Sequence, residues 1–407
     1  MTWEGIKDFF QLKPSGHLYD APLLYSLICL IGVGFIMVTS ASMPEAERLF
    51  DNPYHIMYRQ AAFIMLGAFL FMIATSVKMQ WWKVANPYLL LMGIGLLLAV
   101  LVVGNEINGS KRWIPFGPIN IQASEVAKLF FFSYLAGYLV RKRDEVQKNL
   151  KGFVKPLGVL GAYAFLILLQ PDLGTVVVMF VTTVGLLFLA GARLLQFFAL
   201  ILLGFALVIS LIVLEPYRMA RVVGFLDPWD DPFGKGYQLV QSLMAYGQGG
   251  WFGQGLGNSV QKLQYMPHAH NDFIFAVVAE ELGFVGVFTV LMLLGTLVFR
   301  ALLIGQRALK ADLQFEGYFA LGIGIWFAFQ SMVNVGASAG ILPTKGLTLP
   351  FISYGGSSLL VMAIAAGVLM RIDFETKMAT KQATSRSNGR ASRRTASSPA
   401  AVVQEAA

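Results

Sequence analysis

The sequence predicts an all-α integral membrane protein with about ten transmembrane helices and one large extracytoplasmic loop. Its 407 residues are 56% hydrophobic and only 13% charged, and its mean hydropathy is +0.64. A soluble domain usually carries about 25% charged residues. The apolar residues also gather in runs of about 20, which is the length that an α-helix needs to cross a hydrocarbon core of about 30 Å. Both observations indicate membrane-spanning helices.

Ten runs of the chain fit this length. The fifth and sixth runs are separated only by Gln170-Pro171-Asp172, so the pair is either a re-entrant hairpin or two full spans. We favour two spans, because each flank has about enough apolar residues to cross the membrane. In chain order, the predicted spans are Ala21–Ala41, Tyr58–Thr75, Pro87–Val103, Val126–Val140, Lys155–Leu169, Leu173–Ala190, Leu195–Leu214, Phe273–Phe299, Gly317–Gly340 and Pro350–Met370.

The distribution of lysine and arginine predicts the orientation of these spans. If the N-terminus is inside, 21 basic residues fall in inner segments and 9 in outer ones, and Lys128 lies within a span. Because basic residues are enriched in cytoplasmic loops, both termini are predicted to be cytoplasmic. The chain then divides into a cytoplasmic N-terminal segment 1–20, a transmembrane domain 21–375 with the extracytoplasmic loop 215–272, and a tail 376–407. The tail is rich in Ser, Thr, Ala and Arg without apolar periodicity, which predicts disorder.

The composition excludes several other classes of protein. A single cysteine, Cys29, permits neither an internal disulfide nor a thiolate metal cluster, and the four histidines form no i,i+4 metal pair. The net charge of +8 comes mostly from residues between the apolar runs and in the tail, which is typical of membrane topology and not of a nucleic-acid-binding surface. The first twenty residues lack the apolar core of a signal peptide, so the first span is predicted to remain in the protein.

Ionisable residues within or beside the predicted spans are few, and they mark a candidate site. Because charge is costly at membrane depth, such residues usually face a cavity or a partner. Glu125 and Lys128 open the fourth span three residues apart, so they share one helix face, and Gln122 lies one turn earlier. The pair is either a site or a self-neutralising ion pair that aids packing. Ahead of it, Arg112 and Trp113 are either an interfacial anchor or the cationic rim of a site for a phosphate-bearing lipid.

Three acids on the predicted outer side are further candidates. Asp172 precedes the sixth span, where it is either an N-cap or a catalytic group. Asp272 is the last acid before the eighth span. It is either a cap or a general base, because partial burial makes a carboxylate readier to accept a proton. Glu280 lies eight residues later on nearly the same face, about 12 Å deeper. It needs a basic or hydrogen-bonding partner there, and Lys128, the only cation buried by sequence, is the natural candidate.

The segment between the last two spans, residues 340–358, contains two prolines and paired glycines. Broken helices at membrane depth are tolerated where they line a cavity. Small residues in the same place also allow helices to pack closely. The sequence leaves both interpretations open. Lys345 lies in this segment and is included among the candidate substrate-binding residues.

Several of these motifs together resemble the SEDS family (shape, elongation, division, sporulation) of bacterial cell-wall glycosyltransferases. The resemblance extends from the first span to about Arg371, and Thr344-Lys345 is similar to the division branch of the family rather than to its elongation branch. Ala123 and Asn271 depart from the family pattern without removing an ionisable group. The motifs, in the family's order, are Lys111-Arg112-Trp113-Ile114, Gln122 to Lys128, Gln170 to Thr175, His270 to Ala276 with Glu280-Glu281-Leu282-Gly283, and Ser353 to Ser358.

The resemblance implies a peptidoglycan glycosyltransferase that polymerises lipid II at the division septum, on the outer side of the bacterial inner membrane. It implies that Asp272 is the general base, and that Glu125 and Lys128 form a cavity pair that holds pyrophosphate or positions the acceptor. Expected partners are lipid II, a class B penicillin-binding transpeptidase and other division proteins. No cofactor is predicted, and the sequence leaves a requirement for Mg²⁺ or Mn²⁺ open. The other candidate substrate-binding residues are Arg112, Gln122, Ser124, Asp172 and Lys345.

Three alternative functions remain open at this point. A flippase that moves lipid II across the membrane would use the same polar cavity, but it has no need for an outer carboxylate that acts as a base. An elongation polymerase of the same family usually has apolar or small residues in place of Thr344-Lys345. A scaffold that only recruits the transpeptidase would leave Glu125, Lys128 and Asp272 unexplained.

Overall fold

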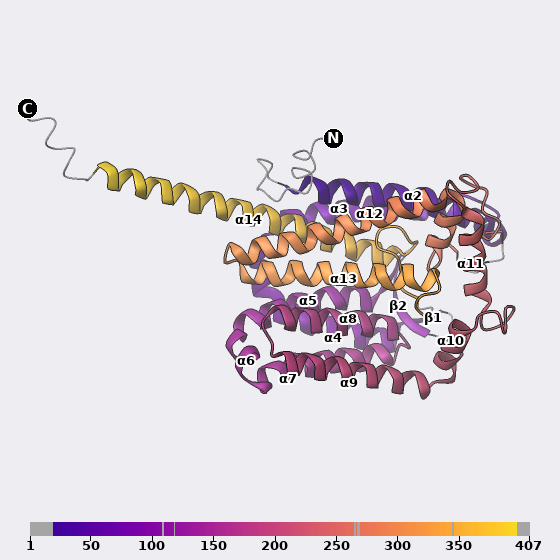
Figure 1. The fold of residues 1–407 in the computed structure, drawn as a ribbon, viewed down its shortest axis with the longest axis horizontal. Helices are drawn as coiled ribbons and strands as arrows, with labels where there is room; N and C mark the ends of the chain where they lie inside the picture. Colours follow the sequence, from indigo (N-terminus) through magenta and orange to yellow (C-terminus); the bar gives the residue numbers. More distant parts are fainter. Residues whose placement is uncertain are drawn as a thin grey trace, which may run out of the picture.

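The computed structural model is a bundle of long helices that run side by side, with a small sheet and two short helices gathered at one end (Figure 1). We call the end that carries the sheet, α10 and α11 the loop end, and the opposite end, where α6 lies, the tail end. The structure describes residues 19–107, 110–117, 119–263, 266, 269–343 and 346–396. The predicted N-terminal segment 1–20 therefore lies almost entirely outside the described residues.

Ten apolar helices form the bundle, and each overlaps one of the ten predicted spans, although α14 begins at Gly356, six residues after the predicted start at Pro350. Within the described residues, nine of them are long and apolar enough to cross a membrane, and the tenth, α8, is apolar but has 17 residues. The predicted membrane fold is therefore confirmed. The helices are α2 Ala21–Phe50, α3 His55–Ser76, α4 Met79–Val103, α5 Ala123–Arg141, α7 Leu150–Leu168, α8 Leu173–Leu189, α9 Leu194–Val213, α12 Ile274–Lys310, α13 Gln314–Ser338 and α14 Gly356–Ala396.

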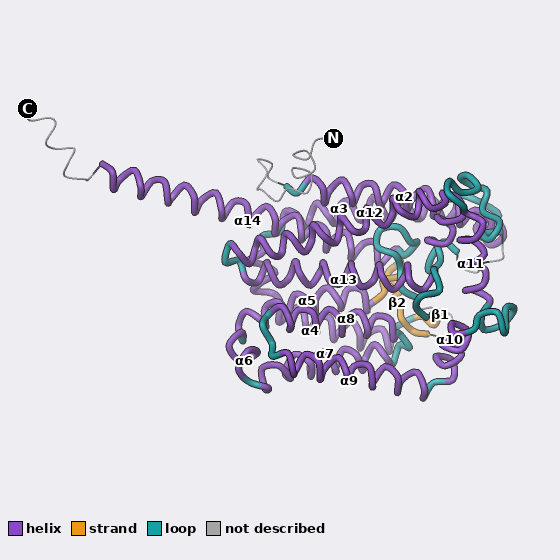
Figure 2. The backbone as a smooth tube through the Cα atoms, viewed as in Figure 1, coloured by secondary structure: helices purple, strands orange, loops and turns teal. Residues whose placement is uncertain are grey.

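Shorter elements connect the long helices at the two ends of the bundle (Figure 2). They are α6 Arg143–Lys148 at the tail end, and α10 Pro216–Leu226, α11 Tyr237–Gly249, β1 Asn105–Ile107, β2 Ser110–Phe116 and β3 Ile119–Gln122 at the loop end. The three strands form an antiparallel sheet in the order β1-β2-β3. The sequence analysis predicted no strands here, because the strands are too short to show a clear alternation of apolar and polar residues. Gly117, with φ +64°, provides the left-handed backbone of the turn after β2.

Three helices occupy the centre of the bundle. In the most apolar stretch of each helix, 78% of the residues are buried in α5, 72% in α13 and 83% in α14, against 17% in α3 and 11% in α9. The outer helices therefore present apolar side chains to lipid, as an integral membrane protein requires. Polar side chains on α5 and α13 lie inside the protein and need partners there.

The C-terminal helix extends beyond the predicted boundary of the tail. Disorder was predicted from residue 376, but α14 continues as one helix to Ala396, and Thr376 and Lys377 are buried. Lys377 Nζ lies 2.7 Å from Asp373 Oδ2, one turn earlier. The helix continues past residue 376 because Met, Ala, Lys and Gln are good helix formers, and a helix that is already nucleated in the bundle extends at little cost. Residues 397–407 lie outside the described residues.

Deletion of the residues after Lys381 is expected to leave membrane insertion, the apparent melting temperature and the activity of the purified protein unchanged. Lys381 is exposed, and the last part of α14 projects away from the bundle (Figure 1). The deleted segment therefore contributes little to packing. Membrane fractionation, a thermal unfolding curve and an activity assay would check this. Loss of activity in the purified truncated protein would refute the prediction, whereas altered recruitment in cells would not.

Candidate active site

Glu125 and Lys128 form a buried ion pair near the start of α5. Lys128 Nζ lies 2.9 Å from Glu125 Oε1, and the two residues are 0% and 4% exposed. The ammonium also donates to Gln330 Oε1 at 3.4 Å and lies 5.0 Å from the centroid of the Trp326 ring. Glu125 Oε2 is buried without a hydrogen-bond partner among the described residues. The pair is thus enclosed between α5 and α13.

A stripe of polar residues along one face of α13 contacts this pair. Its members recur every fourth residue, so they lie on one face of the helix. Gln330 Nε2 donates to Thr348 O at 2.9 Å and to Thr348 Oγ1 at 3.2 Å, which attaches the segment before α14 to the stripe. The sequence analysis overlooked this stripe, although polar residues four apart in an apolar span were a visible signal. The stripe consists of Trp326, Gln330, Asn334 and Ser338.

Asp272 meets the same stripe one helical turn further towards the loop end. Asn334 Nδ2 donates to Asp272 O at 3.0 Å and to Leu347 O at 2.6 Å. The Asp272 side chain is half-buried and points towards Gly346, where a Cβ atom would lie 3.4 Å from Oδ2. The N-cap of α12 is Phe273 and not Asp272. Asp272 and Lys128 are therefore held by residues on consecutive turns of α13.

His270 and Tyr354 join the segment before α12 to the segment before α14. Tyr354 N donates to His270 O at 2.9 Å, and the two rings make an edge contact with centroids 5.4 Å apart. Burial raises the pKa of Tyr354, and the nearby Arg59 opposes this shift. The phenol therefore keeps its proton at neutral pH. His270 Nδ1 lies 3.2 Å from Glu45 Oε2, although the two atoms are not aligned as a hydrogen bond.

Asp172 caps α8, as one interpretation of the sequence predicted. Its Oδ1 accepts from Thr175 N at 3.1 Å and its Oδ2 accepts from Thr175 Oγ1 at 2.7 Å. Ser124 Oγ also donates to Asp172 Oδ2 at 3.3 Å, and Gln122 Nε2 donates to Ser124 Oγ at 3.1 Å. Three predicted site residues therefore lie together where α5 and α8 begin. The Asp172 carboxylate already accepts three hydrogen bonds within the protein, which favours a structural role.

Arg112 holds the turn between α7 and α8. From β2, its Nε donates to Gln170 O at 2.8 Å and its Nη2 donates to Pro171 O at 2.7 Å. These bonds fix the turn that places Asp172 beside Ser124. The residue therefore positions the backbone near the α5 terminus. Lys345, the remaining predicted site residue, lies outside the described residues.

Glu280 has hydrogen-bonding partners, as predicted, but Lys128 is not one of them, so the choice of Lys128 was wrong. The Glu280 carboxylate accepts a hydrogen bond from Ser259 Oγ, one from Val260 N at 2.8 Å and a longer one from Gln261 N at 3.4 Å. The reason is the path of the loop after α11, which folds back onto the start of α12. Backbone and hydroxyl donors from this loop, and not a distant lysine, satisfy the buried acid.

A second buried ionic cluster lies beside Glu280. Lys262 Nζ is 2.7 Å from Glu281 Oε1 and donates to Ser40 Oγ at 2.9 Å, while Ser40 Oγ donates to Glu281 at 2.7 and 2.9 Å. All three residues are less than 10% exposed. The cluster ties the loop to α12 and α2. The sequence analysis counted Lys262 only as a loop cation, and nothing local identifies its partner.

The same loop is inserted into a break in α12. We call residues 250–263 the strap. Gly283 has φ +64° and ψ −163°, which interrupts the helix, and the strap replaces the helical hydrogen bonds that are lost there. The first part of α12, from Ile274 to the break at Gly283, is thereby fixed as a separate unit. The replacement bonds are Gln254 N to Glu280 O at 2.9 Å, Gly255 N to Glu281 O at 3.1 Å, Phe284 N to Gly250 O at 2.9 Å and Val285 N to Trp251 O at 3.1 Å.

Within the described residues, no group of three His, Cys, Asp or Glu side chains lies close enough together to hold a metal ion. The sequence leaves open whether the protein requires a divalent cation. The described part of the chain offers no candidate set of protein ligands for one. The chemistry of the site has to be argued from Asp272, the Glu125–Lys128 pair and the amides of the α13 stripe.

Replacement of Lys128 by Met is expected to destabilise the protein by about 3 kcal/mol, because it leaves Glu125 buried without its cation. The double variant Lys128→Met/Glu125→Gln should recover most of this loss. Apparent melting temperatures in detergent would measure both effects. An equal loss in the single and double variants would show that packing, and not the charge, matters at this position.

The Lys142–Glu145 pair provides a matched control with the same i,i+3 spacing. Its Nζ–Oε1 distance is 2.6 Å, but both side chains are solvent-accessible. Hydrogen bonds from Lys142 and Lys155 lower the pKa of Glu145, so this carboxylate stays charged. Because it is solvent-accessible, water can solvate it when Lys142 is replaced. Lys142→Met should therefore change the melting temperature little.

Comparison with known proteins places the chain among bacterial cell cycle proteins. The model of the FtsW, RodA and SpoVE family, described as "Cell cycle protein", matches residues 21–378. The "Probable peptidoglycan glycosyltransferase FtsW" of Pseudoalteromonas translucida (strain TAC 125) is 76% identical over 380 residues, which are 93% of this chain and 96% of the relative. The protein of the same name from Escherichia coli O6:H1 (strain CFT073) is 55% identical over 361 residues, with 89% and 87% covered.

Solved structures share the fold. A chain of the structure described as "Structural coordination of polymerization and crosslinking by a peptidoglycan synthase complex" matches with a TM-score of 0.72 and 29% identity, covering 88% of this chain and 98% of that chain. The rod shape determining protein RodA of Thermus thermophilus matches with a TM-score of 0.63 and 27% identity, covering 88% and 98%. The family model and the relatives agree over nearly the whole bundle. The chain therefore belongs to the FtsW, RodA and SpoVE family of cell cycle proteins.

Proposed function

We propose that this chain is a peptidoglycan glycosyltransferase that polymerises lipid II into glycan strands at the division septum, with Asp272 as the general base. The relatives that carry this activity in their names match the chain over most of its length. The observation that carries the proposal is the position of Asp272, one turn of α13 away from the buried Glu125–Lys128 pair. A proton acceptor and a cation are thus held on one rigid helix face.

The proposed reaction joins an acceptor sugar to a lipid-linked donor. The acceptor hydroxyl attacks the anomeric carbon of the donor, a C–O bond forms, the bond to the pyrophosphate breaks, and the lipid pyrophosphate leaves. Asp272 takes the hydroxyl proton. A sugar hydroxyl is a poor nucleophile at neutral pH, and a positioned base typically contributes about 10²–10⁴-fold to such a step.

Lys128 is suited to stabilise charge on the leaving group. Its ammonium has three N–H donors, and within the described residues it makes hydrogen bonds to two acceptors, Glu125 Oε1 and Gln330 Oε1. A donor thus remains for a phosphate oxygen, which would reach the buried ammonium when the contact between α5 and α13 opens. Glu125 and Gln330 hold the ammonium in place, so little reorganisation is needed when the charge develops.

The proposal includes the orientation and a partner. The inner loops predicted to be cytoplasmic lie at the tail end and Asp272 lies towards the loop end, which supports a site on the extracytoplasmic side of the inner membrane and cytoplasmic termini. The structural relative from a peptidoglycan synthase complex supports a class B penicillin-binding transpeptidase as the partner. Other division proteins would recruit the pair to the septum.

The test is polymerisation by purified components. The chain, reconstituted with its transpeptidase partner and supplied with labelled lipid II, is expected to produce a ladder of glycan chains on a gel. Wild-type protein that makes no polymer but moves lipid II across vesicle membranes would instead support the flippase function. Polymerisation combined with localisation along the side wall of the cell would support an elongation role in place of a septal one.

A further inference from the structure

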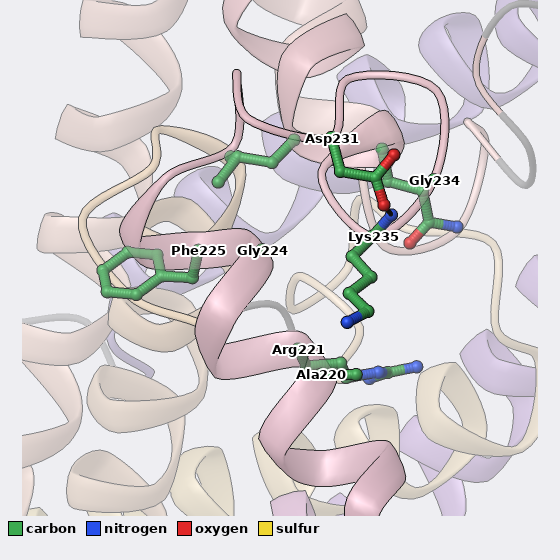
Figure 3. A pocket seen from close by; sticks show the side chains of 9 residues that line it. Ala220, Arg221, Gly224, Phe225, Asp231, Gly234 and Lys235 are labelled. Atoms are coloured by element: carbon green, nitrogen blue, oxygen red, sulfur yellow. Dashed lines mark hydrogen bonds between the residues drawn. The ribbon is translucent and has the colours of Figure 1, made fainter.

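A cavity of about 480 Å³ lies at the loop end between α10, the following loop and the start of α11 (Figure 3). Arg221 and Phe225 line it from α10, Asp231 and Lys235 from the loop, and Gln238 from α11. The cavity shares no residue with the Glu125, Lys128 and Asp272 region. It therefore has to be explained separately from the proposed active site.

Two cationic side chains, Arg221 and Lys235, line this cavity. Figure 3 shows that Lys235 extends from its loop towards Arg221, while the Asp231 carboxylate lies at the opposite end of the Lys235 side chain. Asp231 Oδ2 accepts a hydrogen bond from the Lys235 backbone N at 3.0 Å, so this acid organises its own turn. Within the described residues, the Lys235 ammonium has no hydrogen-bond or ion-pair partner. The cavity is therefore suited to an anion.

The cavity is a fixed feature of the packing. A Cβ atom on Gly224 would lie 2.6 Å from Lys235 O, so only glycine lets the loop approach α10 this closely. Gly236 is equally constrained, because its Cβ would lie 2.1 Å from Pro228 O. The first contact holds the loop against α10, and the second fixes the turn of the loop itself. The backbone at Lys235 is therefore held close to α10.

The position of α10 places the cavity at the membrane surface. Only residues 214–215 separate it from the apolar helix α9, so α10 begins where a span ends. Leu226 is 73% exposed, Trp229 is 55% exposed and Phe233 is 89% exposed. Helices that combine arginine with exposed apolar residues lie at the depth of lipid headgroups, and tryptophan is enriched at that interface.

We propose that this cavity binds the phosphate group of a lipid at the membrane surface. Arginine binds phosphate through paired N–H donors, lysine adds a point charge, and the exposed apolar residues beside them suit the first methylenes of a lipid chain. The volume exceeds that of a phosphate alone and admits a pyrophosphate or a glycerophosphate. An anionic phospholipid and a polyprenyl pyrophosphate share this chemistry. The proposal concerns binding alone and stands without the proposed polymerase activity.

The test measures binding of defined lipids to the full chain in dodecyl maltoside micelles, which contain no phosphate. The probes are phosphatidylglycerol, undecaprenyl pyrophosphate and diacylglycerol, which lacks phosphate, and native mass spectrometry counts the bound lipids. Lys235→Gln is expected to weaken binding of at least one phosphate-bearing lipid roughly tenfold, since a hydrogen bond to a charged group contributes about 1.5 kcal/mol or more. Arg48→Gln, an exposed cation at the end of α2, is the charge-matched control.

Each outcome decides the proposal. Selective loss of phosphatidylglycerol binding identifies a bulk phospholipid as the ligand, and selective loss of undecaprenyl pyrophosphate binding identifies a lipid-linked intermediate. Lys235→Glu, which reverses the charge of an exposed side chain, should weaken the same lipid further in protein that retains its wild-type melting temperature. Unchanged binding in Lys235→Gln, equal weakening in Arg48→Gln, or equal binding of diacylglycerol would overturn the proposal.

Discussion

Asp272→Asn is expected to reduce glycan synthesis by roughly a hundredfold or more while the protein inserts and folds normally. The substitution keeps the size of the side chain and removes its ability to accept a proton. The backbone of the residue is held by α13, because Asn334 donates to Asp272 O. This backbone oxygen is unchanged in the variant. Chemistry and folding are therefore separated at this position.

The measurement is the initial rate of polymer formation from labelled lipid II, together with the melting temperature and the binding of the transpeptidase partner. Asp230→Asn is the matched control, because Asp230 is an exposed loop acid at the same end of the bundle. It should retain the wild-type rate. A near wild-type rate in Asp272→Asn would show that Asp272 is not the base, and Glu125 would become the next candidate.

Local patterns in the sequence were sufficient to predict the helices. Each span was identified from the length of an apolar run, which depends only on the thickness of the membrane. The Glu125–Lys128 contact was predictable for the same reason, since a spacing of three places two side chains on one helix face. The position of Asp172 before α8 likewise identified an N-cap. These features require no knowledge of the tertiary fold.

The partners of the deeper acids were not predictable in this way. Lys128 was the natural candidate for Glu280 because that lysine was the only cation buried by sequence, but backbone and hydroxyl donors from the loop after α11 bind Glu280 instead. Lys262 lies 222 residues from Ser40 in the chain, and only the fold brings them together. Charge and burial show that an acid needs a partner, but they do not identify it.

Gly283→Ala is expected to destabilise the folded protein by an amount on the order of 5 kcal/mol, which exceeds the loss expected for Lys128→Met. A Cβ atom at this position would lie 2.3 Å from Gly253 N, which is backbone and cannot rotate away. Alanine also disfavours the backbone conformation with φ 64° and ψ −163°, which only glycine adopts readily, by about 1–3 kcal/mol. If the strap is displaced, the N–H groups of Phe284 and Val285 lose their acceptors, and each unsatisfied group costs about 1–3 kcal/mol.

The experiment compares two glycines of the same helix. Gly295 has no atom within 4 Å of its would-be Cβ, so Gly295→Ala should be neutral or slightly stabilising, as alanine is in a helix interior. Gly253→Ala tests the same contact from the strap side, because its Cβ would lie 2.1 Å from Glu281 O. Since both changes break one contact, the double variant should lose much less than the sum of the single losses. If the Gly283→Ala and Gly295→Ala proteins had the same melting temperature, the strap would not be what holds α12.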